Sequence, residues 1–436
     1  MDTIVKYRQF FIMIILWLLT SIVAGPVNIG LITLSVLILK LRNRYTELLV
    51  GFLFVCTMSD NRLKVFSSFE SAKYVYIVLL TLFLLFDSKK FRPLSRFFLA
   101  FLPFIIVACY CIIHTPSANF IQCVLKTLSY FFLLLTIPNY VNKSYRDNGY
   151  DFIRLLIYSA LFLLSLGLLL RFFIPSAVSF EERYRGLLGN PNGMGLYCLV
   201  IFVLTGLLNK SLPDLFHRQE KIILYLLLIV SVFLCGSRNS IVAILIFIAF
   251  SYLTRISPVL SFVILLFILT GYEYIDINIV TIVKSLGIER YFRIDTLSDA
   301  AGRYVAWGFA WKNISKNIFY GHGIDYTDYL FILNQDMLNT LGHQGNAHNS
   351  YLTFWLDTGI VGLLLYLWAF IGKFIKAARK NKLIIAALYA ILFSVIFESY
   401  LTASLTPNTI IIFVLLSVFT SDEILPIKTE AIIPLH

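Results

Sequence analysis

Apolar runs recur along almost the whole 436-residue chain, separated by short charged or turn-forming clusters. A helix needs about 20 predominantly apolar residues to cross the hydrocarbon core of a bilayer. The sequence therefore predicts an all-α polytopic membrane protein. The runs cover about fourteen stretches, at residues 9–24, 27–40, 45–58, 72–86, 96–114, 120–137, 152–174, 190–208, 221–235, 239–254, 257–271, 351–373, 383–400 and 406–420.

The composition agrees with this prediction. Hydrophobic residues make up 59% of the chain and charged residues only 14%, whereas a soluble domain carries about 25% charged residues. This balance excludes an ordinary cytoplasmic enzyme, a disordered chain and a secreted disulfide scaffold. The six cysteines lie within or at the ends of apolar runs, so we interpret them as small hydrophobic residues.

Two of the early runs are short. Residues 27–40 and 45–58 fall below the roughly 17 residues that a spanning helix needs, so this pair is either spanning or re-entrant, and we expect about 12–14 transmembrane helices. No small-residue cleavage pattern follows the first run, which argues against a removed signal peptide. We divide the chain into N-terminal transmembrane helices (1–271), one long loop (272–350), and C-terminal transmembrane helices with a short tail (351–436).

The distribution of basic residues predicts the orientation. Lys and Arg gather in alternate loops, at residues 40–44, 89–96, 143–146, 210–221 and 373–382. Loops rich in Lys and Arg face the cytoplasm, so both termini are predicted inside and the long loop outside. The net charge of +12 then reflects topology, and we expect no nucleic-acid partner.

The long loop is too long to be a simple connector. Apolar residues at helical spacing predict a helix from about Asp299 to Ile314, and a second short helix is expected over Gln335–Leu341. The glycine-containing stretch Asn317–Asp328 is predicted to form turns.

Four features of the predicted external loops contain residues that could bind a ligand or take part in a reaction. Arg238 stands at a membrane boundary in Gly236-Ser237-Arg238-Asn239, and Arg303 lies on the loop helix. Each is either an anion ligand or an ordinary snorkelling or packed arginine. Arg183 and Arg185 either extend an anion site or anchor their loop. The fourth feature is the segment of residues 343–350, which places two His and two Asn before a membrane helix.

The ordered set of motifs resembles the O-antigen ligase/O-antigen polymerase family over roughly residues 180–420. The motifs are R-x-R-G…N-P-N at Arg183–Asn192, Gly236-Ser237-Arg238, Gly302-Arg303-x-x-x-Trp307 followed by Gly321-x-Gly323, and His348-Asn349-Ser350-Tyr351-Leu352 followed by Gly359-Ile360-Val361-Gly362. Members of that family are bacterial inner-membrane glycosyltransferases that act at the periplasmic face and usually have about twelve spans.

The resemblance implies that Arg238 and Arg303 bind the diphosphate of an undecaprenyl-diphosphate-linked oligosaccharide and that His348 is the catalytic histidine. A histidine can take the proton from an acceptor hydroxyl, and Arg forks bind phosphate in two-point contacts. No D-x-D occurs, so we expect no metal and no other cofactor. His343 is the fallback base. Further candidate substrate contacts are Arg183, Arg185, Asn192, His322, His343, Asn349 and Lys73.

Several alternatives stay open. A polymerase transfers the glycan to another lipid-linked repeat unit, and a ligase transfers it to a lipid A-core sugar; aromatic residues in the loop favour the polymerase. A transporter or flippase would place ionisable groups at mid-membrane and show related halves, and a structural scaffold would tolerate changes in the polar loop. Membrane lipid and a chain-length regulator are expected partners. Lys126 lies inside an apolar run, and the sequence shows no partner for it.

Overall fold

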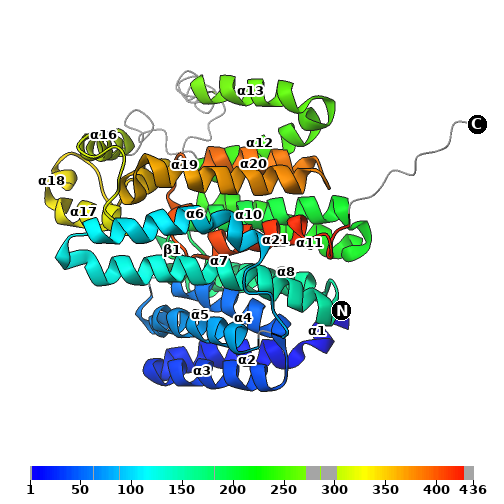
Figure 1. Ribbon diagram of the computed structural model, residues 1–436. Coiled ribbons are helices and arrows are strands. Elements are labelled where there is room, and N and C mark those ends of the chain that lie inside the picture. Colours follow the sequence, from blue (N-terminus) through cyan, green and yellow to red (C-terminus); the bar gives the residue numbers. More distant parts are fainter. Residues whose placement is uncertain are drawn as a thin grey trace, which may run out of the picture.

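The computed structural model describes residues 2–61, 63–87, 89–180, 182–271, 285 and 302–426. It is a helical bundle whose long helices lie roughly side by side (Figure 1). Within the described residues, the strands are the two-residue antiparallel pair β1 (Ser179–Phe180) and β2 (Arg183–Tyr184). The predicted all-α polytopic fold is confirmed.

Each predicted apolar run corresponds to one helix. They are α2 (Arg8–Val23), α3 (Gly25–Leu41), α4 (Tyr45–Ser59), α5 (Ser68–Phe86), α6 (Arg96–Cys111), α7 (Phe120–Asn148), α8 (Asp151–Phe173), α10 (Pro191–Ser211), α11 (Arg218–Cys235), α12 (Arg238–Ile256), α13 (Pro258–Thr270), α19 (Ser350–Ala378), α20 (Leu383–Ser394) and α21 (Pro407–Thr420). The short helices α1 (Asp2–Lys6) and α9 (Pro175–Val178) precede α2 and β1.

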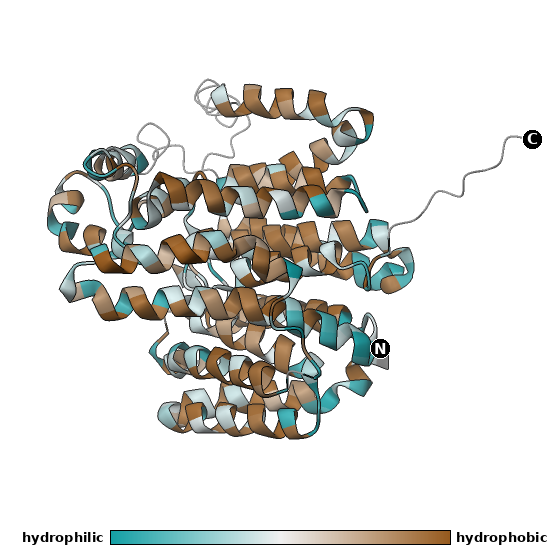
Figure 2. Ribbon diagram, viewed as in Figure 1, coloured by the Kyte–Doolittle hydropathy of each residue, from teal (hydrophilic) through white to brown (hydrophobic). Residues whose placement is uncertain are grey.

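Seven of the described helical segments are long and apolar enough to cross a membrane, and six further apolar helices have 10–17 residues. The shorter ones include the central helices: residues 45–58 of α4 and all of α21 are buried. Hydrophobic residues cover most of the bundle, and hydrophilic residues gather at helix ends (Figure 2). Lipid-facing surface therefore belongs mainly to helices around this centre, such as α2, α11 and α12.

Local sequence explains where several helices begin and end. Ser95 and Asn190 accept a hydrogen bond from a backbone N–H in the first turn of α6 and α10, respectively, as N-cap residues do. Gly236 ends α11 in the left-handed conformation, with φ 57°, which glycine adopts at no steric cost. The chain can therefore reverse at Gly236 and begin α12 at Arg238.

The two ends of the bundle differ. Described residues near both termini lie at the end formed by the α7–α8 turn, where Lys6 pairs with Asp151 (2.5 Å) and Arg146 pairs with Glu423 (2.6 Å). The loop helices α16 (Arg303–Ile314), α17 (Tyr326–Leu333) and α18 (Gln335–Thr340) lie at the opposite end, on the left in Figure 1. The side of the membrane that each end faces stays a prediction.

The loop prediction was right for two helices and incomplete for a third. The described part of the first helix is α16, and its predicted start at Asp299 lies outside the described residues. The predicted second helix is α18. The stretch predicted as turns, residues 317–328, runs into α17, because the Asp357 carboxylate of α19 accepts hydrogen bonds from the backbone N–H groups of Asp325 (3.2 Å) and Thr327 (2.8 Å).

Helix α19 is interrupted at Gly359, whose φ of 69° and ψ of 175° are not helical. The loop segment of residues 318–323 docks into this break. The Gly323 N–H donates to the Asp357 carbonyl (2.8 Å), and the Ile360 N–H donates to the Ile318 carbonyl (3.0 Å). A Cβ atom on Gly359 would overlap the Phe319 backbone. Gly359 is therefore required for the close approach of the two backbones.

The prediction of one helix over residues 383–400 was wrong at its C-terminal end. Helix α20 stops at Ser394, and the chain continues through turns and the 3₁₀ helix η7 (Tyr400–Thr402) to α21. The Ser350 N–H donates to the Val395 carbonyl (2.9 Å), and the Ser350 hydroxyl donates to the Glu398 carbonyl (2.8 Å). Residues 395–398 therefore leave the helical path to satisfy the N-terminus of α19.

Candidate active site

The candidate site is centred on Glu398, an acid in the connection between α20 and α21. Its Oε2 lies 3.6 Å from His348 Nδ1, and its Oε1 lies 3.6 Å from an Arg303 guanidinium nitrogen. Asn192 donates a hydrogen bond from its side-chain amide to the same Oε1 (3.0 Å). One carboxylate thus joins three residues from separate parts of the chain that the sequence motifs had selected.

Burial and charge act in opposite directions on Glu398, whose side chain is 14% exposed. Burial by itself would raise the pKa of the carboxyl. Hydrogen bonding to His348 and the charges of His348 and Arg303, with the Asn192 hydrogen bond, outweigh burial and hold the pKa below its ordinary value. Glu398 is therefore an anion at neutral pH.

His348 is held in an unusual backbone conformation, with φ 45°. A residue with a side chain in this region carries strain, and such strain gathers at functional sites. Its N–H donates to the Asn346 side-chain oxygen (3.0 Å), and its ring Nε2 lies 3.5 Å from the Gln344 carbonyl. The loop therefore directs Nδ1 toward Glu398 and leaves the His348 side chain 32% exposed.

Arg303 is the first residue of α16. The preceding Gly302 has φ 74°, and a Cβ there would come within 2.6 Å of the Gly342 carbonyl oxygen. The Arg303 guanidinium lies over the Phe397 ring at 5.5 Å, an arrangement that orients a cation while leaving its edges available. Trp307 donates from its indole N–H to the Ala347 carbonyl (3.1 Å), which ties α16 to the residue before His348.

A chain of hydrogen bonds leads from Glu398 to Arg183. The Arg183 guanidinium donates to the Asn192 side-chain oxygen (3.0 Å) and to the Cys235 carbonyl (2.8 Å). Arg183 therefore orients Asn192. By contrast, Arg185 is buried and donates to the carbonyls of Ala177 (3.2 Å) and Gly189 (3.4 Å). Of the two roles considered for Arg185, these contacts correspond to anchoring its loop.

Arg238 is the first residue of α12. Arg183 contacts the Gly236 carbonyl (3.3 Å), two residues before Arg238, and the side-chain amide of the next residue, Asn239, donates to the Ser394 carbonyl (3.0 Å). The N-terminus of α12 is thus placed between Arg183 and the segment that leads to Glu398. Arg238 belongs to the same end of the bundle as His348.

His343 and Asn349 have internal partners. His343 is 1% exposed, and its Nε2 lies 3.0 Å from the Asn346 carbonyl; burial, followed by the charge of His348, lowers its pKa. The Asn349 side-chain oxygen caps α19 by accepting from the N–H groups of Tyr351 (2.9 Å) and Leu352 (3.1 Å). In this structure both residues support the loop that carries His348.

His322 and Lys73 lie outside this cluster. The His322 ring contacts the His114 carbonyl (3.2 Å) and the Tyr326 ring (4.3 Å). Lys73 lines a cavity of about 640 Å³ that extends to Asn346, the residue bonded to the His348 backbone. This volume falls in the range of about 300–1,000 Å³ typical of ligand pockets.

The partner that the sequence did not reveal for Lys126 is Asp325, whose carboxylate lies 2.7 Å from the Lys126 ammonium. Asp328 lies 3.9 Å away. All three residues line the same cavity as Lys73. The lysine of α7 therefore joins this helix to the start of α17.

The arrangement suits proton transfer beside an anion. A carboxylate on Nδ1 favours the tautomer with its proton on Nδ1, whose Nε2 takes up a proton when it leaves the Gln344 carbonyl. Guanidinium groups bind phosphate oxygens. Among the described residues, no three His, Cys, Asp or Glu side chains form a group that could hold a metal ion.

Glu398 is the site residue that the sequence reasoning missed, whereas Asn346 was selected only as part of the segment of residues 343–350. Glu398 is the one acid between Asp357 and Asp422, and it lies in a run that was predicted to be membrane-spanning. An ionisable residue in such a run indicates function, so a usable signal was present.

Comparison with known proteins supports the family. The sequence model of the family described as O-antigen ligase matches residues 223–367, about a third of the chain. The match includes Arg238, Arg303 and His348, whereas Arg183, Asn192 and Glu398 lie outside it. No curated protein matches the chain.

Proposed function

We propose, on the premise that residues 223–367 belong to the O-antigen ligase family, that this chain is a glycosyltransferase. It transfers a glycan from undecaprenyl diphosphate to a sugar hydroxyl. The observation that carries the proposal is the meeting of His348 and Arg303 on the partly buried Glu398 carboxylate. The membrane is the bacterial inner membrane, the site faces the periplasm, and both termini are cytoplasmic.

In this mechanism His348 is the general base. The Glu398 carboxylate faces the protonated Nδ1 of His348 and orients the ring. Nε2 then takes the proton from the attacking hydroxyl. The oxygen forms a bond to the anomeric carbon while the bond from that carbon to the diphosphate oxygen breaks. A single displacement of this kind inverts the anomeric configuration.

Arg303 and Arg238 stabilise the charge that develops on the leaving diphosphate. Guanidinium groups make two-point contacts with phosphate, and near a low-dielectric boundary such contacts are stronger than in water. Because these cations supply the positive charge, the proposed reaction needs no metal. Arg303 is held by Phe397 and by α16, so its orientation is set before substrate binds.

The cavity beside Asn346 supports a polymerase. Its volume of about 640 Å³ and its polar wall, which includes Gln122, Tyr329 and Gln335, suit sugar residues of an extended acceptor. The acceptor is then another lipid-linked repeat unit, and a chain-length regulator is the expected protein partner. The alternative acceptor is a lipid A-core sugar, which would make the protein a ligase.

Two substitutions test the proposal. His348→Ala and Arg303→Ala should leave the protein inserted and abundant but abolish long or core-attached glycan on gels at matched expression. His217→Ala and Arg255→Ala remove the same residue types at the other end of the bundle and should retain the glycan ladder. An unchanged ladder in either site variant would exclude the proposed chemistry.

Complementation separates the two acceptors. In a strain that lacks its polymerase, recovery of long chains from a single repeat unit indicates a polymerase. In a strain that lacks its ligase, recovery of attachment to the core indicates a ligase. Recovery in neither strain, with the protein present in the membrane, would contradict both.

A further inference from the structure

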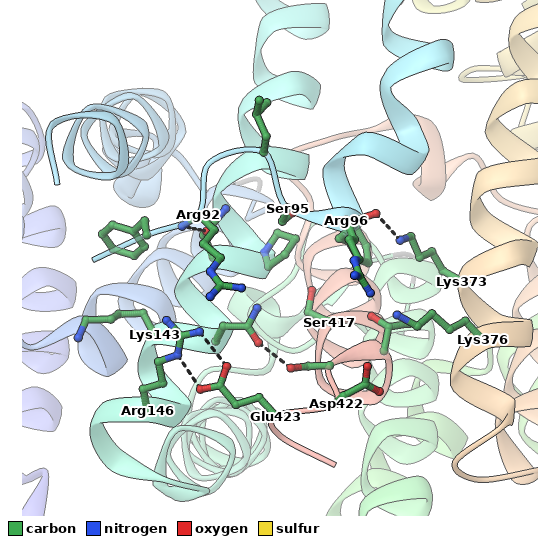
Figure 3. A pocket seen from close by; sticks show the side chains of 18 of the residues that line it. Arg92, Ser95, Arg96, Lys143, Arg146, Lys373, Lys376, Ser417, Asp422 and Glu423 are labelled. Atoms are coloured by element: carbon green, nitrogen blue, oxygen red, sulfur yellow. Dashed lines mark hydrogen bonds and ion pairs between the residues drawn. The ribbon is translucent and has the colours of Figure 1, made fainter. Parts of the chain in front are cut away.

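A second polar cavity, of about 450 Å³, is shown in Figure 3. It lies at the end of the bundle opposite His348, near the Arg146–Glu423 ion pair. It is formed where the start of α6, the C-terminal half of α7 and the C-terminal part of α19 meet the residues that follow α21. Lys373 is 23 residues beyond Ser350 on α19, which corresponds to about 35 Å along a helix. The cavity is thus separated from the candidate active site by about the thickness of a bilayer.

Basic residues dominate the walls of this cavity. Seven lysines and arginines line it, against two acids, Asp422 and Glu423; the basic residues are Lys90, Arg92, Arg96, Lys143, Arg146, Lys373 and Lys376. A topological bias of charge requires only that basic residues be numerous in the loops. Their convergence from three chain segments on one cavity is an additional feature.

Both acids are already paired. Glu423 makes a two-point contact with Arg146 (2.6 and 2.8 Å), and Asp422 lies 2.9 Å from Lys380. In the part of the chain that the structure describes, no carboxylate lies within ion-pair distance of the three remaining central cations, Arg92, Arg96 and Lys376. Figure 3 shows these three side chains directed into the space that they enclose.

Lys373 adds a buried positive charge. It is 8% exposed, and its ammonium donates to the Arg96 carbonyl (2.8 Å). An ammonium has three donors, and burying one without a counter-charge is costly. A bound anion would supply that counter-charge.

Apolar residues at the edge of the cavity point to the source of the anion. Leu94 lines the cavity and is 68% exposed, and Phe91, Phe97 and Pro138 complete its apolar wall. A lipid headgroup could place its phosphate among the cations and its chains beside Leu94, because the cavity lies where helices end. Basic pockets between membrane helices bind anionic headgroups in this way.

We propose that this cavity binds the phosphate of an anionic membrane lipid. Arg92 and Arg96 provide forked contacts to phosphate oxygens, and Lys373 and Lys376 provide point charges. The site is independent of the proposed transferase chemistry, since it shares no residue with the cluster around Glu398.

The test measures lipid binding to the purified full chain by native mass spectrometry. Cardiolipin, phosphatidylglycerol and phosphatidylcholine are titrated separately. Inorganic pyrophosphate is titrated as a soluble anion that carries phosphate groups without lipid chains. We expect the two anionic lipids to bind at least about tenfold more tightly than phosphatidylcholine. Pyrophosphate binding without lipid discrimination would overturn the assignment to a lipid.

Matched variants distinguish binding in this cavity from a general attraction of anionic lipid to the basic residues at this end of the bundle. The triple variant Arg92→Gln, Arg96→Gln and Lys376→Gln should weaken anionic lipid binding by about 10- to 100-fold. Arg42→Gln, Arg218→Gln and Arg379→Gln remove the same charge from outside the cavity and should change binding less than about twofold. Equal losses in the two triple variants would overturn the proposal.

A conservative variant guards against misfolding. Arg92→Lys with Arg96→Lys keeps the charge and should retain part of the affinity lost in the glutamine variant. Wild-type discrimination between lipids in the folded glutamine variant, judged by its thermal unfolding, would also overturn the proposal.

Discussion

The substitution Glu398→Gln removes one negative charge from the centre of the candidate site and leaves the side-chain volume almost unchanged. We expect the protein to fold and insert but to lose most of its transferase activity. Glu398 is a positioning residue, because it acts through His348 and Arg303 rather than on the substrate. The amide cannot hold His348 in the tautomer that the proposed base requires.

The size of the loss follows from the geometry. A pair of unit charges 3.6 Å apart is worth about 4–5 kcal/mol at an effective dielectric constant of about 20. Desolvation of the 14% exposed carboxylate offsets part of this attraction. We therefore expect a net loss of about 2–3 kcal/mol in transition-state stabilisation, or about a 30- to 150-fold lower rate.

The assay uses purified protein in nanodiscs with a labelled lipid-diphosphate-linked glycan and measures kcat and KM. A loss in kcat with little change in KM is expected, because the donor is bound mainly by the arginines. Glu398→Asp should recover part of the rate. Asp151→Asn changes a salt-bridged carboxylate at the other end of the bundle and serves as the control. A Glu398→Gln rate within about threefold of wild type would refute the reasoning.

Three further predictions concern stability. Gly359→Ala should cost at least about 1–3 kcal/mol of unfolding free energy because of the φ of 69° and the overlap with Phe319, whereas Gly372→Ala, which has open space around it, should not; equal thermal unfolding temperatures would contradict this. The lowered pKa of Glu398 predicts that its stabilising contribution is fully present above the ordinary glutamate pKa of about 4.3 and is lost as the pH falls through the lowered pKa. The difference in unfolding temperature between wild type and Glu398→Gln should therefore shrink in acid. A difference that stays constant with pH would contradict this prediction. Lys126→Met leaves the Asp325 carboxylate without its 2.7 Å partner and should lower the free energy of opening α17 by about 1–3 kcal/mol. Proteolysis within residues 326–341 should then be faster than in the surface control Lys210→Met. Equal cleavage rates would disprove a role of Lys126 in anchoring α17.

The helices were predictable because their cause is local. Apolar runs are a property of consecutive residues, so most runs placed a helix close to its observed bounds. Helix α7 continues 11 residues beyond the run at 120–137, because its last turns are polar. Two other exceptions have distant causes. The start of α17 depends on the Asp357 carboxylate, which is 30 residues from Thr327 in sequence. The end of α20 depends on the hydrogen bond from the Ser350 N–H to the Val395 carbonyl.

The site was predictable only in part. Sequence order selected His348, Arg303, Arg183 and Asn192, which lie around one carboxylate in the structure. The carboxylate itself was missed because the apolar residues before Glu398 made the run resemble a spanning helix. Sequence order ranked His348 above His322, but the contacts of the two rings depend on packing, which directs His322 toward the His114 carbonyl and His348 toward Glu398.

The break in α19 has a consequence for protein engineering. Backbone hydrogen bonds between residues 318–323 and residues 356–360 make the outer loop and the following helix one interlocked piece. A chimaera that exchanges only the loop between related proteins would leave unmatched backbone groups inside the recipient helix. Exchange designs should therefore transfer the loop and the helix through Ile360 together.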